Sequence, residues 1–442
     1  MDRIRNFLAL LRGQLWPVPV LFALGAVGLA YVLLSYGHQF SPNGRIWWVY
    51  SGNAGTARDL LGSLLSGLMT MTSLVVSVTF VILTLAANQL GPRLISIFMG
   101  DRQLQSVLGL FIGTILYVIL VLRTLDETLG SDGVPHLAVT AASLLTILCL
   151  LALLFYIHKI ARSIIADNVV EAVSQEFRGT LHDILPDQDN DASASKQPLQ
   201  GLRWPLGMEK AGYVQVVDYD DLLSIACEAD VRIAVKVRAG HYLLREGEHV
   251  DIYSTAPPDE ELRVRIRRAF TIGTERTSAQ DPEHGIRQLV EIATRALSPG
   301  TNDPFTAIAV IERLGAAFEE IFARHVQPHV IKDSDGETRI IADRSDVAGL
   351  LAAAFHPIRQ AGRTHPAILI RIAEIVGDLA ATTTAASQRE ALSGQLTRLA
   401  ETALLENTTR HDRQDIMASI KQAENALLNG PWRDQSEEAH RH

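Results

Sequence analysis

Four stretches of the first 160 residues contain no Asp, Glu, Lys or Arg, and this feature constrains the fold more than any other. They cover residues 13–44, 60–92, 103–122 and 133–158. A bilayer core of about 30 Å needs roughly 20 apolar helical residues, and each stretch contains a segment of that length. The sequence therefore predicts four transmembrane helices within residues 1–160.

The charged residues are divided unevenly between the two parts of the chain. Residues 1–160 carry 9 basic and 6 acidic side chains, a net charge of +3, whereas residues 161–442 carry 31 and 43, a net charge of −12. This pattern excludes a secreted protein, a wholly soluble enzyme and a nucleic-acid binder with a basic face. The two cysteines, Cys149 and Cys227, are too few for a disulfide framework or a thiolate zinc site.

Basic residues that flank the spans predict the orientation, because Lys and Arg resist translocation. One side of the membrane carries Arg3, Arg5, Arg12, Arg93, Arg102, Lys159 and Arg162. The other side carries Arg45, Arg58 and Arg123 among several acidic residues. We therefore expect a multi-pass protein of the lipid bilayer with both termini in the cytoplasm.

Apolar residues continue at helical spacing beyond the fourth predicted span. This spacing predicts that residues 161–186 form an amphipathic stalk helix that projects into the cytoplasm. Residues 187–200 are polar and poor in apolar side chains, which favours a linker. At the other end of the chain, we expect residues 431–442 to be a disordered tail.

Between the linker and the tail, the apolar pattern changes its period. Residues 201–256 alternate as short strands do, which predicts a small β-module. Residues 257–430 are largely of helical period, with one hairpin whose turn contains Asp333 and Gly336. That turn lacks the spacing of a calcium loop, so we expect a tight turn. The predicted fold class is an α-helical membrane protein with a cytoplasmic α+β region, a small β-module followed by a helical bundle.

The second span carries a line of polar side chains on one face. At 100° per residue they fall within an arc of about 80°. We call this set the hydroxyl stripe: Ser63, Ser66, Thr70, Ser73, Ser77, Thr84 and Asn88. Hydrocarbon offers these groups no hydrogen-bond partner, so they are expected to face protein or water.

Two interpretations of the hydroxyl stripe remain open. If several copies surround an axis, the six members from Ser66 to Asn88 line a hydrophilic pathway, and Phe80 and Val81 form a hydrophobic constriction. Alternatively, Ser and Thr serve close helix packing and bond to neighbouring helices or to their own backbone. A neutral lining gives no preference for ions of either sign.

The densest polar segment of the C-terminal part lies between residues 270 and 305. Five of its side chains could converge on an anion or a phosphorylated ligand: Arg276, His284, Arg287, Arg295 and Asn302. The alternative is a solvated ladder of salt bridges followed by a capped turn between two helices.

Motifs for nucleotide hydrolysis, dinucleotide binding, zinc proteases and serine hydrolases do not occur. We therefore expect neither an enzyme nor a cofactor or metal site. Two blocks, Thr72 to Leu125 and Ala269 to Ile308, resemble those of a bacterial family of predicted membrane proteins with a domain of unknown function, number twenty-two fifty-four. The resemblance implies a bacterial inner-membrane location and supplies no catalytic or ligand residues.

The sequence leaves two hypotheses for function. The first is a homo-oligomeric channel, or a channel-like protein, for small ions, with the second span along the pathway and the cytoplasmic domain setting assembly or gating. The second is a membrane-anchored sensor or scaffold whose cytoplasmic domain binds a ligand or protein, without transport.

Overall fold

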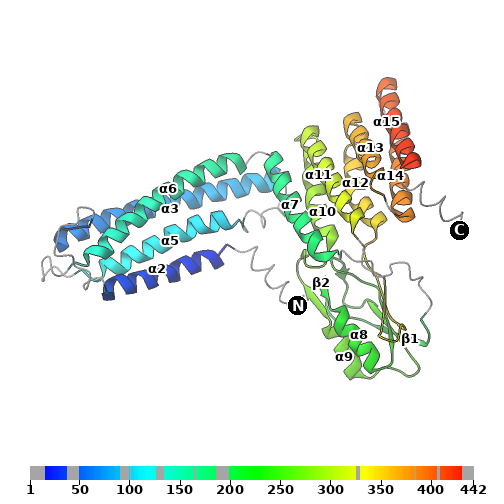
Figure 1. Cartoon of the computed structure of the whole chain (residues 1–442), viewed down its shortest axis with the longest axis horizontal. Helices are drawn as coiled ribbons and strands as arrows, with labels where there is room; N and C mark the ends of the chain where they lie inside the picture. The colour runs from blue at the N-terminus through cyan, green and yellow to red at the C-terminus, as the bar shows by residue number, and fades with distance from the viewer. Residues whose placement is uncertain are drawn as a thin grey trace. The chain divides into compact units, whose positions relative to one another are not determined.

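The computed structural model describes residues 15–36, 49–89, 99, 101–125, 134–163, 166–185, 199–324, 329–383, 385–405 and 409–430. The chain divides into two compact units, shown in Figure 1. One unit runs from Leu11 to Asn168, and we call it the membrane unit. The other begins at Val169, and we call it the C-terminal unit. The predicted tail at 431–442 and almost all of the predicted linker lie outside the described residues.

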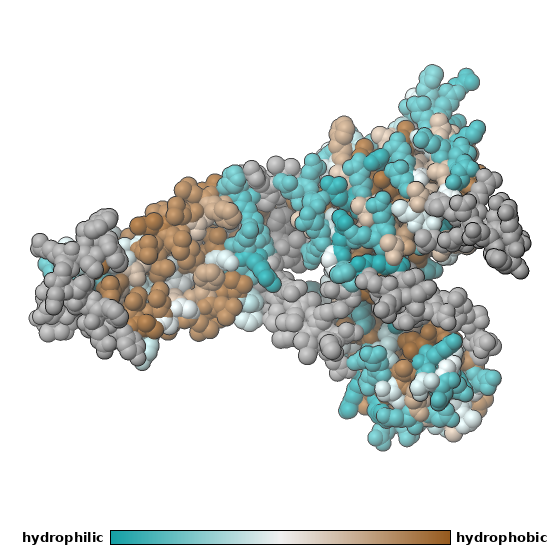
Figure 2. Space-filling view, viewed as in Figure 1, coloured by the Kyte–Doolittle hydropathy of each residue, from teal (hydrophilic) through white to brown (hydrophobic). Residues whose placement is uncertain are grey.

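The membrane unit contains four long apolar helices, as the charge-free stretches predict. They are α2 (Pro17–Tyr36), α3 (Ala54–Gln89), α5 (Arg102–Leu122) and α6 (His136–Ser163). All four are long and apolar enough to cross a membrane. Helix α5 packs against the other three and has the most buried span. The apolar surface of these helices is visible as brown in Figure 2.

Helix α2 approaches α5 closely because two glycines of α5 remove the side chains between them. A Cβ atom on Gly109 would lie 2.8 Å from Cδ2 of Phe22, and one on Gly113 would lie 3.0 Å from the Phe22 carbonyl oxygen. Small residues four apart permit this kind of contact between membrane helices. The Gly109 and Gly113 pair therefore serves packing within one chain.

Helix α7 (Ala166–Ile184) is amphipathic, as the continuing apolar period predicts, and it belongs mainly to the C-terminal unit. Its buried face consists of Val169, Val170, Val173, Phe177, Leu181 and Ile184. Phe177 packs against Gly285 of α10 (Pro282–Ala296), and Glu171 pairs with Arg313 of α11 (Pro304–Ala323) at 2.6 Å. These contacts attach α7 to the helices of the C-terminal unit.

Two sheets form the β-part of the C-terminal unit. The strands are β1 (Leu202–Leu206), β2 (Gly212–Val217), β3 (Arg232–Val235), β4 (Tyr242–Leu243), β5 (Val250–Ser254), β6 (Phe270–Gly273), β7 (Val330–Lys332) and β8 (Thr338–Ala342). Their orders are β1-β5-β3-β8-β7 and β4-β2-β6. Helices α8 (Tyr219–Glu228) and α9 (Glu260–Arg268) accompany them. Ile233, Val250 and Ile252 are fully buried in the shared core.

The sheets extend beyond the boundary that we predicted for the β-module, 201–256. Strand β6 follows that boundary, and the hairpin β7-β8 adds to the edge of β3, with Ile233 opposite Ile340 in parallel register. A parallel partner about a hundred residues away leaves no local signal, since only the hairpin itself is visible in the sequence. The turn at Asp333 is tight, because its carboxylate accepts from the backbone N–H groups of Asp335 and Glu337.

Six helices complete the C-terminal unit in two layers, visible side by side in Figure 1. Helix α10 packs on α12 (Val347–Ala361), which packs on α14 (Ala386–Leu405). In the other layer α11 packs on α13 (Pro366–Ala380), which packs on α15 (Arg410–Asn429). Asp281, Asp303, Asp346 and Thr409 cap the N-termini of α10, α11, α12 and α15 through their side chains.

Candidate functional site

The hydroxyl stripe lies on the exposed face of α3. Ser63, Ser66, Thr70, Ser73, Ser77 and Thr84 are all exposed in the membrane unit. The packed face of α3 contains Leu61, Leu68 and Val75, which are fully or almost fully buried. At 100° per residue the two faces are roughly opposite. The helix therefore turns its polar side away from the other helices of its own unit. Asn88 lies in α3, but its side chain is outside the described residues.

Half of the exposed hydroxyl groups bond back to the helix. Ser63, Thr70 and Thr84 donate to the carbonyl oxygens four residues earlier, over 2.8 to 3.0 Å. Such bonds satisfy a hydroxyl group without any external partner. The hydroxyl groups of Ser66, Ser73 and Ser77 have no hydrogen-bond partner within the described part of the chain. Within the described part of the hydroxyl stripe, these three serines are the members whose hydroxyl groups make no hydrogen bond.

Two large apolar side chains interrupt the stripe. Phe80 and Val81 are 65% and 66% exposed and lie between Ser77 and Thr84 along the helix. Both project from the same side of α3 as the serines. Their role as a constriction stays a prediction.

The exposed faces of α2 and α6 carry large apolar side chains, as α3 itself does at Met69 and Leu74 beside the stripe. On α2 the large exposed side chains include Leu21, Leu24 and Val27. On α6 they include Leu144, Leu151 and Leu154. Faces of this composition suit contact with lipid, where van der Waals packing is the main interaction.

In the C-terminal unit, two of the five candidate ligand residues meet at one carboxylate. Arg276 lies 3.9 Å and Arg287 3.1 Å from Oε2 of Glu283. Arg276 also donates two hydrogen bonds to Oδ2 of Asp281, over 2.9 and 2.6 Å. Both arginines therefore already have carboxylate partners.

The other three candidates lie elsewhere along the helices. Arg295 pairs with Glu291 at 3.6 Å, and Oδ1 of Asn302 accepts a hydrogen bond from Nε2 of His365 over 3.0 Å. His284 follows Glu283 in the first turn of α10. Asp303 caps α11, and Asn302 has a left-handed backbone with a φ of 48°. This arrangement is a ladder of ion pairs followed by a capped turn, and ligand binding here stays a prediction.

Two further residues, Arg238 and Asp343, belong to the ion network around Asp281 and Glu283, and the sequence patterns did not indicate them. Arg238, which follows β3, donates to Glu283 over 2.9 Å and to Asp343 over 3.0 Å. Gly240 packs directly against the network, since a Cβ atom there would lie 2.2 Å from Oδ2 of Asp281. The partners are about 40 to 100 residues apart in sequence, so no local pattern could identify them.

The network shifts the pKa values of its two carboxylates in opposite directions. Burial raises the pKa of Asp281 above its usual value, despite the Arg276 guanidinium beside it. Burial also acts on Glu283, but hydrogen bonds from Arg238 and Arg287 outweigh it and lower its pKa. Because Arg238 follows β3 and Glu283 lies in α10, their ion pair joins the sheets to α10. Among the residues that the structure describes, no group of three metal-binding side chains occurs.

The comparisons with known proteins agree with this architecture. The family model described as predicted membrane protein (DUF2254) matches residues 12–378. The chain belongs to this family. The DUF2254 match covers all four apolar helices, both sheets and the helices up to α13. The resemblance inferred from the two sequence blocks is therefore confirmed.

Curated DUF2254-like relatives come from mycobacteria. Uncharacterized proteins of Mycobacterium bovis and of Mycobacterium tuberculosis are each 28% identical over 434 residues, which is 96% of this chain and 82% of theirs. No solved structure matches the chain. The aligned region therefore includes residues of both units of this chain.

Proposed function

We propose that this DUF2254 protein is a homo-oligomeric channel of the bacterial inner membrane. In each subunit, the exposed face of α3 lines a hydrophilic pathway for small ions. The observation that supports this most directly is the exposure of the unpartnered Ser66, Ser73 and Ser77 hydroxyl groups. In hydrocarbon each would lose its hydrogen bonds to water, whereas an aqueous pathway restores them.

In this proposal Phe80 and Val81 gate the pathway. Rings of exposed apolar side chains around a narrow axis exclude water and so block ions by dewetting. The C-terminal unit, with both termini on the cytoplasmic side, sets assembly or gating, because α7 directly follows α6 in sequence and docks on α10 and α11.

Planar bilayers with the purified full chain test the channel. We expect wild type to conduct, Val81→Ser to conduct more because it wets the constriction, and Ser77→Leu to conduct less. Leu148→Ser, on the exposed face of α6, is the matched control and should behave as wild type. Absence of conductance in wild type and in both α3 variants would sink the proposal.

A membrane-anchored sensor or scaffold is the second candidate. The compactness of the C-terminal unit favours it, because this unit has its own hydrophobic core. In that case residues 169–442, which include most of α7, fold and bind their ligand or protein without the spans. A thermal-shift screen of this fragment with phosphorylated small molecules tests it. The sensor is supported if a compound raises the melting temperature of the fragment and Arg287→Gln abolishes that increase. In that case Val81→Ser and Ser77→Leu, the variants of α3, have no effect on function.

A further inference from the structure

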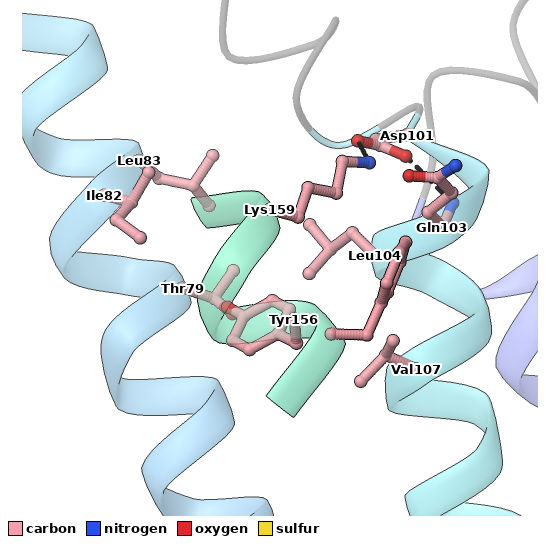
Figure 3. A pocket seen from close by; sticks show the side chains of 10 residues that line it. Thr79, Ile82, Leu83, Asp101, Gln103, Leu104, Val107, Tyr156 and Lys159 are labelled. Carbon is pink, nitrogen blue, oxygen red and sulfur yellow. Dashed lines mark hydrogen bonds and ion pairs between the residues drawn. The ribbon is translucent and has the colours of Figure 1, made fainter. Parts of the chain in front are cut away.

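Helix α3 leaves the packed core of the membrane unit before it ends. Its last buried side chain is Thr79, although the helix continues to Gln89. None of the later α3 side chains that the structure describes is buried. A groove opens there between α3 and α5, with α6 behind it, as Figure 3 shows.

The inner part of this groove is apolar. Its walls are formed by Ile82 and Leu83 of α3, Leu104 and Val107 of α5, and Phe155 of α6. Its polar groups are already satisfied, because the Thr79 and Tyr156 hydroxyl groups contact each other and both bond to the Val75 carbonyl oxygen. A bound water needs two to four polar partners, so the groove suits hydrocarbon better than water.

The mouth of the groove is charged. Lys159 forms an ion pair with Asp101, whose carboxylate also caps α5 by accepting from the Gln103 backbone N–H over 2.8 Å. The Lys159 side chain remains 29% exposed, and an ammonium group has three donors. Lys159 is therefore the cation that lines the mouth, and its ammonium group has donors beyond the one paired with Asp101.

We propose that this groove binds one phospholipid of the bilayer. One acyl chain lies between α3 and α5, and the phosphate contacts Lys159. The arrangement of the lining residues supports this occupant, because apolar walls within the spans lead to the Lys159 ammonium group where the apolar part of α6 ends. A phospholipid has the same order, from acyl chain to anionic headgroup. The site does not depend on whether the protein conducts ions.

Native mass spectrometry of the full chain, released from detergent, tests the proposal. We expect wild type to retain one phospholipid per chain and Leu104→Trp to lose it, because the indole fills the groove. Ile112→Trp is the matched control on the same helix. Its side chain is exposed away from the groove, so it should retain the lipid.

A second series tests the mouth without altering the packing. Lys159→Gln should weaken binding of added phosphatidylglycerol about fivefold, Lys159→Arg should restore it, and neither should change binding of uncharged diacylglycerol. The proposal is overturned if wild type retains no phospholipid, or if all variants retain it equally. It is also overturned if Leu104→Trp changes the number of chains per particle instead, since the groove is then a contact between copies.

Discussion

Gly240 allows the loop after β3 to pack closely against Asp281 at the start of α10. Its φ of 88° lies in the left-handed region, and a Cβ atom there would meet Asp281 and Arg276 at 2.2 and 2.3 Å. We expect Gly240→Ala to destabilise this unit by about 2 kcal/mol or more. Hydrogen exchange of β2 and the first turn of α10 in the full chain measures this.

The control for that substitution is Gly300→Ala, in the turn between α10 and α11. A Cβ atom on Gly300 meets nothing within 4 Å, and its φ is not in the left-handed region. Protection should therefore change little. Equal losses in the two variants would contradict the role assigned to Gly240.

His249 makes the stability of the sheets depend on pH. It is 5% exposed, and its Nδ1 accepts from the Met208 backbone N–H over 3.1 Å. Burial lowers its pKa below the usual 6.5, and Lys236 acts in the same direction. A lowered pKa means that the stabilisation is present above pH 6.5 and is lost as the pH falls through the folded-state value.

The matched variant is His249→Asn, whose side-chain oxygen can accept the same hydrogen bond without titrating. Hydrogen exchange around Met208 is compared between wild type and variant at each pH, so that intrinsic exchange rates cancel. We expect the advantage of wild type to shrink between pH 7.5 and 5.5. A difference that stays constant with pH would rule out His249 as the source.

At the scale of elements, α7 can pack on α10 because position 285 of α10 is a glycine and carries no side chain. A Cβ atom on Gly285 would lie 2.3 Å from the Phe177 ring, so Gly285→Ala should displace α7 from α10. Gly179→Ala, on α7 itself, meets nothing within 4 Å and should stabilise the helix by up to about 1 kcal/mol. Limited proteolysis of α7 should accelerate in the first variant only. Equal cleavage in both would contradict this contact.

Local signals predicted most of the helices and strands. Asp259, Asp303 and Asp346 cap helices, and proline begins α10, α11 and α13, so the helical period of residues 257–430 corresponds to helices in the structure. The pairing of β3 with β8 and the bonds of Arg238 could not be predicted, because they join segments far apart in sequence. For α3, the period placed the hydroxyl groups on one face, but only packing decides which face is exposed.

At the scale of the whole molecule, the two units account for the uneven charge of the chain. The apolar helices of the membrane unit carry few charges, whereas the C-terminal unit places many acidic residues at its surface and in ion pairs. For the membrane unit, we expect the hydroxyl stripe on α3 to be in contact with water when the full protein is assembled in a bilayer.

Thiol accessibility in proteoliposomes measures this contact most directly. Cys149 and Cys227 are first replaced by alanine, and Ser73→Cys, Ser77→Cys and Leu148→Cys are then compared in that background. A charged thiosulfonate reagent reacts only with a thiolate, which forms in water and not in hydrocarbon. We predict that the two α3 cysteines react at least about tenfold faster than the cysteine on the exposed face of α6. Equal, slow reaction at all three positions would contradict the account.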